Sequence, residues 1–190
     1  IGGQMTYSMG PQLSADSITF YKNHLDRTIT EYDLNLTDEE TRRLLDRIHK
    51  QDNDVDRFYS YDYYLNNCST AVRDVIDDAV GGRLNPILEA IKTESTFRSE
   101  TRRLMPVGFV NRVLIVGMDL AAGRKSDRKL NASEESFVPM RLGPYLQNVV
   151  LTDADGSQRK LVSESRVLNV ATSSGNFEPP ARRKLRYRSR

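Results

Sequence analysis

The chain has 190 residues, of which 38% are hydrophobic and 28% are charged, and no stretch approaches the roughly 18 consecutive apolar residues of a membrane-spanning helix. Its formal net charge is +2, but residues 182–190 hold six of the 28 basic residues, which leaves 22 basic against 26 acidic residues in the body. An acidic body disfavours nucleic-acid binding. The single cysteine excludes an internal disulfide and a Cys-rich zinc site.

The first 50 residues are predicted to alternate between strands and helices. Alternating side chains predict strands over residues 4–9 and 28–34, and helical periodicity predicts a helix over residues 14–27. Thr37 followed three residues later by Glu40 is a capping-box pattern, so a second helix is expected to begin there and to run to about Lys50.

The middle and end of the chain are predicted to be mostly helical, with a closing hairpin. A helix over residues 68–80 ends at Gly81-Gly82, and an apolar stripe is expected to face inward: Cys68, Ala71, Val72, Val75, Ile76 and Ala79. Residues 84–147 have a helical pattern throughout, with a helix beginning at Pro106. Residues 149–151 and 160–168 flank a turn at 153–156 and predict a β-hairpin.

These elements predict an α+β fold: a small antiparallel sheet, the Cys68 helix packed on it and a largely helical C-terminal half. One domain is expected over residues 1–170, with a linker and basic tail over residues 171–190. The tail is expected to be a solvated end or the cut end of a connection to a further segment. The functional alternatives are attraction to anionic lipid head groups or contact with nucleic acid. The aromatic run 58–65 is expected to pack in the core or to line a substrate pocket.

The segment around Cys68 is the main candidate for chemistry. Asn66 or Asn67 can cap the helix, which puts Cys68 in its first turn, where unpaired N–H groups and the helix dipole favour a thiolate. The same N–H groups can bind the oxyanion that forms when a thiolate attacks a carbonyl carbon. The opposing interpretation is a structural cysteine, because free cysteines are among the most buried residues.

A resemblance to a known family adds to this reasoning. The segments that carry it are residues 27–37, residues 59–74 with the Asn-Cys-Ser-Thr-x-x-Arg-Asp element, residues 97–103, residues 117–123 with 127–128, and residues 135–139. In type and order they resemble the Lnb N-terminal periplasmic domain family, over roughly residues 3–165. That family is bacterial and extracytoplasmic, and it resembles circularly permuted papain-like hydrolases and acyltransferases. In its namesake the domain precedes transmembrane helices and takes part in lipoprotein N-acylation with phospholipid as donor.

The resemblance implies that Cys68 is the acyl-accepting nucleophile of a periplasmic or extracytoplasmic protein. Membrane anchoring of the full-length protein is a further expectation from the resemblance. It implies that Arg73 and Asp74 match the family's Arg-Asp pair, and the helical wheel favours a structural ion pair for them. Asn67 and Thr70 are expected to shape the helix start. Neither a metal nor a cofactor is implied, and the partners expected are a phospholipid, lipoprotein or peptide substrate.

A cysteine nucleophile requires a general base, usually a histidine, and this is where the chain differs from the family pattern. The family's histidine stands in a Gly-His element upstream of the segments described above, and this chain has only His24 and His49, neither of which follows a glycine. Both are expected to have structural or surface roles. We expect the histidine-bearing part to precede Ile1; a histidine from another chain and a catalytically inactive protein are the alternatives.

Three functions follow as hypotheses. The first is acyl transfer or hydrolysis through a thioester on Cys68, with a lipid or lipoprotein substrate. The second is hydrolysis of cell-wall peptides, as in NlpC-type peptidases. The third is a non-catalytic envelope binding domain with a structural Cys68.

Overall fold

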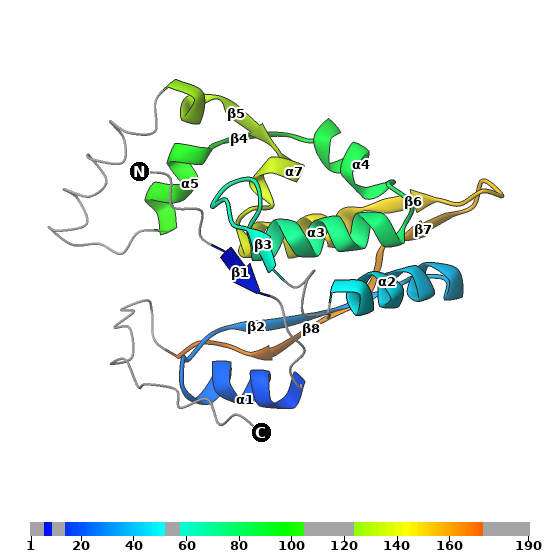
Figure 1. The fold of residues 1–190 in the computed structure, drawn as a ribbon, viewed down its shortest axis with the longest axis horizontal. Coiled ribbons are helices and arrows are strands. Elements are labelled where there is room, and N and C mark those ends of the chain that lie inside the picture. Colours follow the sequence, from blue (N-terminus) through cyan, green and yellow to red (C-terminus); the bar gives the residue numbers. More distant parts are fainter. Residues whose placement is uncertain (1–5, 9–13, 52–57, 105–123, 173–190) are drawn as a thin grey trace, which may run out of the picture.

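The computed structural model describes residues 6–8, 14–51, 58–104 and 124–172. The predicted helix at Pro106 and the basic tail therefore lie outside the described residues. Within the described ranges the protein combines helices with short antiparallel strands, so the predicted α+β class is confirmed (Figure 1).

The N-terminal elements follow the predicted order. They are β1 (Thr6–Ser8), α1 (Ser14–Asn23), β2 (Ile29–Leu34), α2 (Asp38–Gln51) and β3 (Phe58–Ser60). Helix α2 begins as the capping box predicts, because the Glu40 N–H donates to the Thr37 hydroxyl at 3.3 Å and the Thr37 N–H donates to the Glu40 carboxylate at 2.8 Å. Helix α1 ends earlier than predicted, and Asp26 just beyond it has a left-handed φ of 44° that turns the chain away from the helix.

The middle elements are α3 (Cys68–Ala79), α4 (Leu84–Ala90), β4 (Lys92–Thr96) and α5 (Phe97–Leu104). Helix α3 ends where the sequence predicts, because Gly81 and Gly82 have φ values of 71° and 74°. An L side chain rarely adopts this left-handed conformation, so the glycine pair allows the sharp turn into α4.

The C-terminal elements are a short 3₁₀ helix (Arg124–Asp127), β5 (Lys129–Asn131), α7 (Ala132–Glu135), α8 (Pro139–Asn148), β6 (Val150–Thr152), β7 (Gln158–Lys160) and β8 (Val162–Asn169). The predicted hairpin forms between β6 and β7, with Gly156 in its turn at a φ of 83°. After β7 the chain continues as β8, which pairs with β2 instead of extending the hairpin.

The prediction that residues 84–147 are helical throughout is wrong, because β4 and β5 form an antiparallel pair among them. Strand β4 carries Thr93 and Thr96, whose β-branched side chains favour extended backbone. The Thr93 hydroxyl also donates to the Leu130 carbonyl at 2.9 Å, which ties the two strands together. Pairing with a distant segment therefore outweighs the local helical pattern here.

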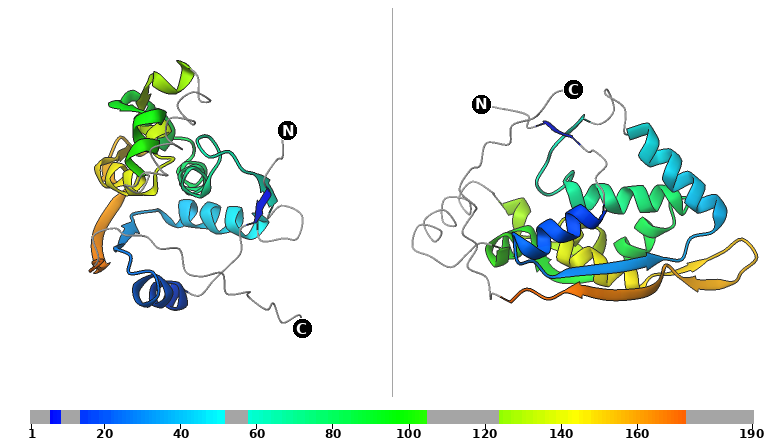
Figure 2. Two further views of the ribbon diagram at one scale, coloured as in Figure 1. Left: turned by 90° about the vertical axis from the view of Figure 1, so that its left-hand side faces the viewer. Right: turned by 90° about the horizontal axis from the view of Figure 1, so that it is seen from below.

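The described strands form four two-stranded antiparallel sheets, where the sequence predicts one small sheet. The β2–β8 ribbon is the longest and sets Tyr32 opposite Ser165. It runs between α1 on one side and the body that contains α2 and α3 on the other (Figures 1 and 2). The Cys68 helix α3 packs mainly against the helices α2, α4 and α8 rather than on a broad sheet.

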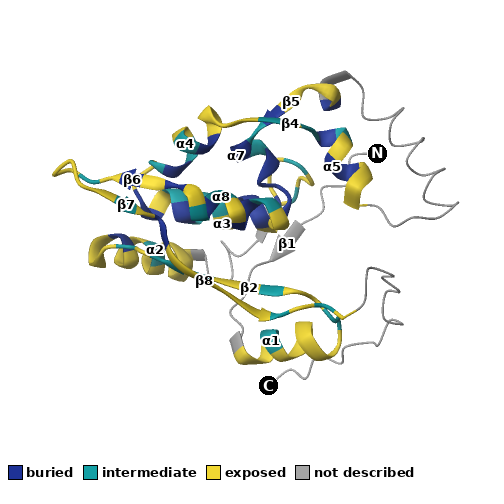
Figure 3. Cartoon of the chain, turned by 180° about the vertical axis from the view of Figure 1, so that it is seen from behind, coloured by how far each residue is buried: buried dark blue, intermediate teal, exposed yellow. Residues whose placement is uncertain are grey.

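The main hydrophobic core lies among α3, α4, α8 and the β6–β7 hairpin. Its fully buried members include Leu84, Leu88, Leu151 and Leu161, and side chains of β2 such as Tyr32 pack against its edge. A second, smaller cluster lies between α5 and the start of α8 and consists of Phe97, Leu130, Phe137 and Val138, with Tyr64 packed against it. Figure 3 shows that the buried residues concentrate in the part of the protein that contains α3, α4, α7 and α8, whereas α1 and the β2–β8 ribbon are mostly exposed.

Candidate functional site

The start of α3 is fixed by a capping box between Asn67 and Thr70. The Asn67 side-chain oxygen accepts the N–H groups of Ser69 at 2.8 Å and of Thr70 at 3.0 Å, and the Asn67 N–H donates to the Thr70 hydroxyl at 2.8 Å. Of the two asparagines that the sequence offers as a cap, the cap is therefore Asn67. Asn66 closes the preceding turn, where it forms an isolated bridge with Asp62 and its amide donates to the Ser60 carbonyl.

The same helix start is tied to the segment before α8. The Asn67 amide donates to the carbonyls of Tyr63 at 2.9 Å and Phe137 at 2.8 Å, and the Ser69 hydroxyl donates to the Ser136 carbonyl at 2.6 Å. Asn67 is only 4% exposed, and its side chain makes four hydrogen bonds. This network holds the first turn of α3 in a fixed position relative to the chain entering α8.

These bonds change the expected oxyanion site. Asn67 occupies the N–H groups of Ser69 and Thr70 with its side chain and that of Ala71 with its carbonyl. Among the first four N–H groups of α3, the Cys68 N–H alone has no partner in the part of the chain that the structure describes. The start of α3 therefore offers an oxyanion one backbone N–H group, where the sequence predicts several.

Cys68 itself is exposed, so the prediction that the stripe faces inward is wrong at its N-terminal end, whereas Ile76 and Ala79 of the same stripe are buried as predicted. Val72, one turn further along, is 51% exposed, whereas Ser69, Thr70, Ile76 and Ala79 form the buried face of α3. The polar residues bury without penalty because their hydroxyl groups donate to backbone carbonyls. The thiol is thus accessible, and the buried structural cysteine has no support in the geometry.

Cys68 lines an open pocket of about 360 Å³ with a mostly apolar wall. Its lining residues come from β2, α3 and α8: Tyr32, Cys68, Ser69, Val72, Pro139, Leu142, Gly143 and Leu146. A volume of this size lies within the range of small-ligand sites, which are typically apolar with a few polar groups.

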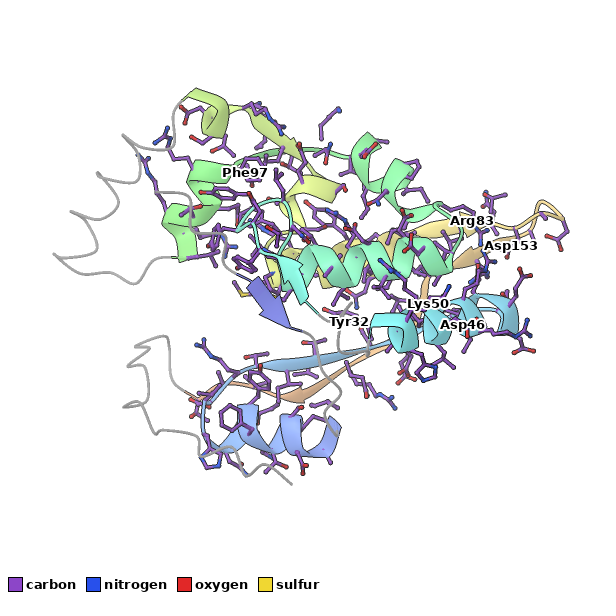
Figure 4. The ribbon with its side chains drawn as sticks, viewed as in Figure 1. Tyr32, Asp46, Lys50, Arg83, Phe97 and Asp153 are labelled. Atoms are coloured by element: carbon purple, nitrogen blue, oxygen red, sulfur yellow. The ribbon has the colours of Figure 1, made fainter. Side chains whose placement is uncertain are left out.

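Tyr32 and Gly143 form the contact between the ribbon and α8 in this pocket. A Cβ built on Gly143 would lie 2.7 Å from Cε2 of the Tyr32 ring, and closer still to the hydroxyl, so only glycine fits there. Figure 4 labels Tyr32 where β2 passes beneath α3. Sequence reasoning missed both residues, because neither the tyrosine in the strand nor the glycine within α8 has a local pattern that indicates a site.

Arg73 and Asp74 form the ion pair that the helical wheel favours. The Arg73 guanidinium donates to Asp74 at 2.6 and 2.8 Å and to the Ser133 carbonyl at 2.7 Å. This last bond ties α3 to α7. Neither residue lines the Cys68 pocket.

Neither histidine lines the Cys68 pocket. His24 lies just beyond the end of α1, where its ring packs on Phe20 with 5.5 Å between ring centroids, and exposed His49 lies in the last turn of α2. In the described ranges no group of three or more His, Cys, Asp or Glu side chains is arranged to hold a metal ion.

Buried carboxylates hold the body together, a role that the sequence analysis did not predict for them. Glu40 is 2% exposed and accepts hydrogen bonds from Arg159, at 2.7 Å to each oxygen, and from Arg83. Both arginines also pair with Asp153, at 2.8 Å from Arg159 and 3.0 Å from Arg83 (Figure 4), and these bonds hold the pKa of Asp153 below its usual range. The network joins α2, the turn before α4 and the β6–β7 hairpin, so its role is structural.

A second buried carboxylate, Glu100 on α5, is 3% exposed and pairs with Arg103 at 2.6 Å and Arg141 at 3.0 Å. Burial acts to raise the pKa of Glu100, but the hydrogen bonds from the two arginines outweigh it and lower the pKa. Arg141 also approaches buried Glu135, which accepts the Tyr145 hydroxyl; burial and this bond raise the pKa of Tyr145. These bonds link α5, α7 and α8.

The model of the Lnb N-terminal periplasmic domain family matches residues 1–103 of the chain. This is more than half of the 190 residues, so the protein belongs to that family. The match contains the Asn-Cys-Ser-Thr element and ends before residues 117–123, 127–128 and 135–139.

The family description places the domain in the periplasm, on the extracytoplasmic side of the bacterial envelope. Comparisons with curated proteins and with solved structures find no match. None of the helices in the described ranges has the length and apolar character needed to cross a bilayer.

Proposed function

We propose that the protein transfers or hydrolyses acyl groups through a thioester on Cys68, with a lipid or lipoprotein of the bacterial envelope as substrate. The observation that carries the proposal is an exposed thiol, at the capped start of a 12-residue helix, that lines an apolar pocket. Membership of a periplasmic domain family supports a substrate at the envelope.

The pocket favours an acyl chain over a cell-wall peptide. Val72, Pro139, Leu142 and Leu146 present hydrocarbon beside the thiol, and the pocket lining contains no charged side chain that would pair with the carboxylates of a muropeptide. An acyl chain requires only apolar contact, and each buried methylene contributes about 0.8 kcal/mol.

The chemistry balances in two half-reactions. In the first, the thiol loses its proton to a base, the sulfur forms a bond to the acyl carbonyl carbon, and the bond from that carbon to the ester oxygen breaks as the leaving group takes a proton. In the second, an amine or water forms a bond to the thioester carbon, the C–S bond breaks, and Cys68 regains a proton. We assign the base to an imidazole that these 190 residues do not supply, since neither His24 nor His49 lines the pocket; an activated ester such as a p-nitrophenyl ester can react with the thiolate without it.

Chain-length selectivity tests the proposal. The protein is incubated with p-nitrophenyl esters of acetate, butyrate and octanoate, and acylation of Cys68 is followed by peptide mass and by release of the thioester with hydroxylamine. We expect the acylation rate constant to rise by up to about fourfold per methylene until the pocket is filled, which is the 0.8 kcal/mol increment expressed as a ratio. Cys68→Ser should abolish the adduct.

Variants of two exposed valines provide the matched comparison. Val72→Arg should remove the chain-length preference because Val72 lines the pocket, whereas Val167→Arg should leave it unchanged, since Val167 is 60% exposed on β8 and is no part of the pocket lining. Vesicles of phosphatidylethanolamine and purified muropeptides then compare the two substrate classes. A thiol that resists every ester, or acylation that ignores chain length, would refute a lipid acyl site.

A further inference from the structure

An acyl-transfer site needs hydrogen-bond donors for the oxyanion that forms when the thiolate attacks the carbonyl carbon. In this protein the helix start supplies only one, because Asn67 already binds the N–H groups of Ser69 and Thr70. The Ala71 N–H is occupied by the Asn67 carbonyl at 2.9 Å. A second donor must therefore come from another element that reaches the pocket.

The pocket lining offers few polar side chains besides Cys68. The Ser69 hydroxyl donates to the Ser136 carbonyl at 2.6 Å and is buried, so its hydrogen is directed away from a substrate. The remaining lining residues from α3 and α8 have apolar side chains or, at Gly143, none. Tyr32 is therefore the remaining pocket-lining residue whose side chain can donate a hydrogen bond to a substrate. Its hydroxyl has no hydrogen-bond partner among the described residues.

Three features hold Tyr32 in its position. Antiparallel pairing with β8 sets it opposite Ser165, and the Gln147 amide of α8 donates to the Ser165 hydroxyl at 2.6 Å. Helix α8 is thereby tied to the ribbon beside Tyr32. The absence of a side chain on Gly143 then lets the phenol ring lie directly against the helix, and Tyr32 lines the same pocket as Cys68.

We propose that the Tyr32 hydroxyl is the second oxyanion donor of this site and acts with the Cys68 N–H on the carbonyl oxygen of the acyl substrate. The inference rests on the proposed acyl transfer at Cys68. The phenol donates a hydrogen bond as the carbonyl oxygen becomes negative and keeps its proton, so no covalent bond of Tyr32 is made or broken.

The test compares two reactions of the same thiol in the full chain. Acylation by p-nitrophenyl butyrate passes through an oxyanion, whereas alkylation by iodoacetamide displaces iodide and forms none. Tyr32→Phe should lower the acylation rate constant of Cys68 by about 100-fold, the loss typical of one oxyanion donor. The same variant should alkylate within about twofold of the parent rate, because the negative charge of the alkylation transition state lies on sulfur and iodine and no carbonyl oxygen becomes an oxyanion for the phenol to stabilise.

Two further variants separate donation from packing. Gly143→Ala, which displaces the Tyr32 ring, should lower acylation comparably, and adding Tyr32→Phe to it should cause little additional loss, since both remove one interaction. Tyr63→Phe makes the same chemical change on a 43% exposed tyrosine that is no part of the pocket lining, and should leave both reactions unchanged.

The outcomes distinguish the two proposals. A parent chain that alkylates but never acylates refutes acyl transfer, and the oxyanion role falls with it. A parent chain that acylates at the same rate as Tyr32→Phe leaves acyl transfer standing and overturns the role of Tyr32. Equal losses in acylation and alkylation would mean that Tyr32 only shapes the pocket, which also overturns it.

Discussion

Replacing Asn67 by alanine should be among the most destabilising single changes in this protein. The side chain caps α3 through Ser69 and Thr70 and donates to the carbonyls of Tyr63 and Phe137, all from a residue that is 4% exposed. Losing the cap costs about 1 kcal/mol. Leaving the buried Phe137 carbonyl and the half-buried Tyr63 carbonyl without donors costs roughly 2–3 kcal/mol more, so the total is about 3–4 kcal/mol.

Urea unfolding followed by circular dichroism at 222 nm measures this loss, with the slope m expected to stay unchanged. Asn67→Ser retains a capping oxygen but no amide, and should therefore lose about 2–3 kcal/mol. The matched control is Asn148→Ala, which removes an exposed amide bonded to the Pro144 carbonyl at 2.8 Å and should cost under about 0.5 kcal/mol. An Asn67→Ala variant within about 1 kcal/mol of the parent would refute the account of this helix start.

Three further predictions concern stability. Cys68→Ser should change the free energy of unfolding by less than about 0.5 kcal/mol, because the thiol is exposed; a loss above about 2 kcal/mol would restore the structural interpretation. Glu40→Gln should lower the free energy of unfolding, measured with urea, by about 2–3 kcal/mol. This is less than the loss expected for a fully buried ion pair, because the Arg83 side chain is 32% exposed. The control Glu39→Gln should be nearly neutral, because the Glu39 side chain is 73% exposed. Folding lowers the pKa of Glu100, so this carboxylate stabilises the fold fully above the unfolded-state pKa of about 4.3, and its contribution is lost as the pH falls through the lower folded-state pKa. Glu100→Gln should therefore make the stability of the protein less dependent on pH in the acid range. An unchanged pH dependence would contradict the ion pairs of Glu100.

Local signals in the sequence were sufficient to predict where α2 starts and where α3 ends. Thr37 with Glu40, and Gly81 with Gly82, act through bonds and dihedral angles within a few residues, so the sequence contains the whole interaction. The Arg73–Asp74 pair was predictable for the same reason.

Features that depend on distant partners were not predictable. Residues 92–96 are extended because β5 pairs with them. Helix α3 turns Cys68 outward because the Ser69 hydroxyl donates to the carbonyl of Ser136, which is 67 residues away in the sequence. The identity of the thiol as the candidate site came from its neighbours in sequence. Its pocket, by contrast, depends on β2 and α8, and Tyr32 and Gly143 meet only after the chain has folded.

The β2–β8 ribbon also has a consequence for folding kinetics. It joins residues 29–34 to residues 162–169, so the chain between its strands contains α2, α3, α4 and α8. Closing a loop of this length is entropically unfavourable before the intervening segments are compact, and such non-local pairing is characteristic of slow steps. The ribbon should therefore form late, so that a newly synthesised chain would acquire its exposed thiol before Tyr32 arrives beside it.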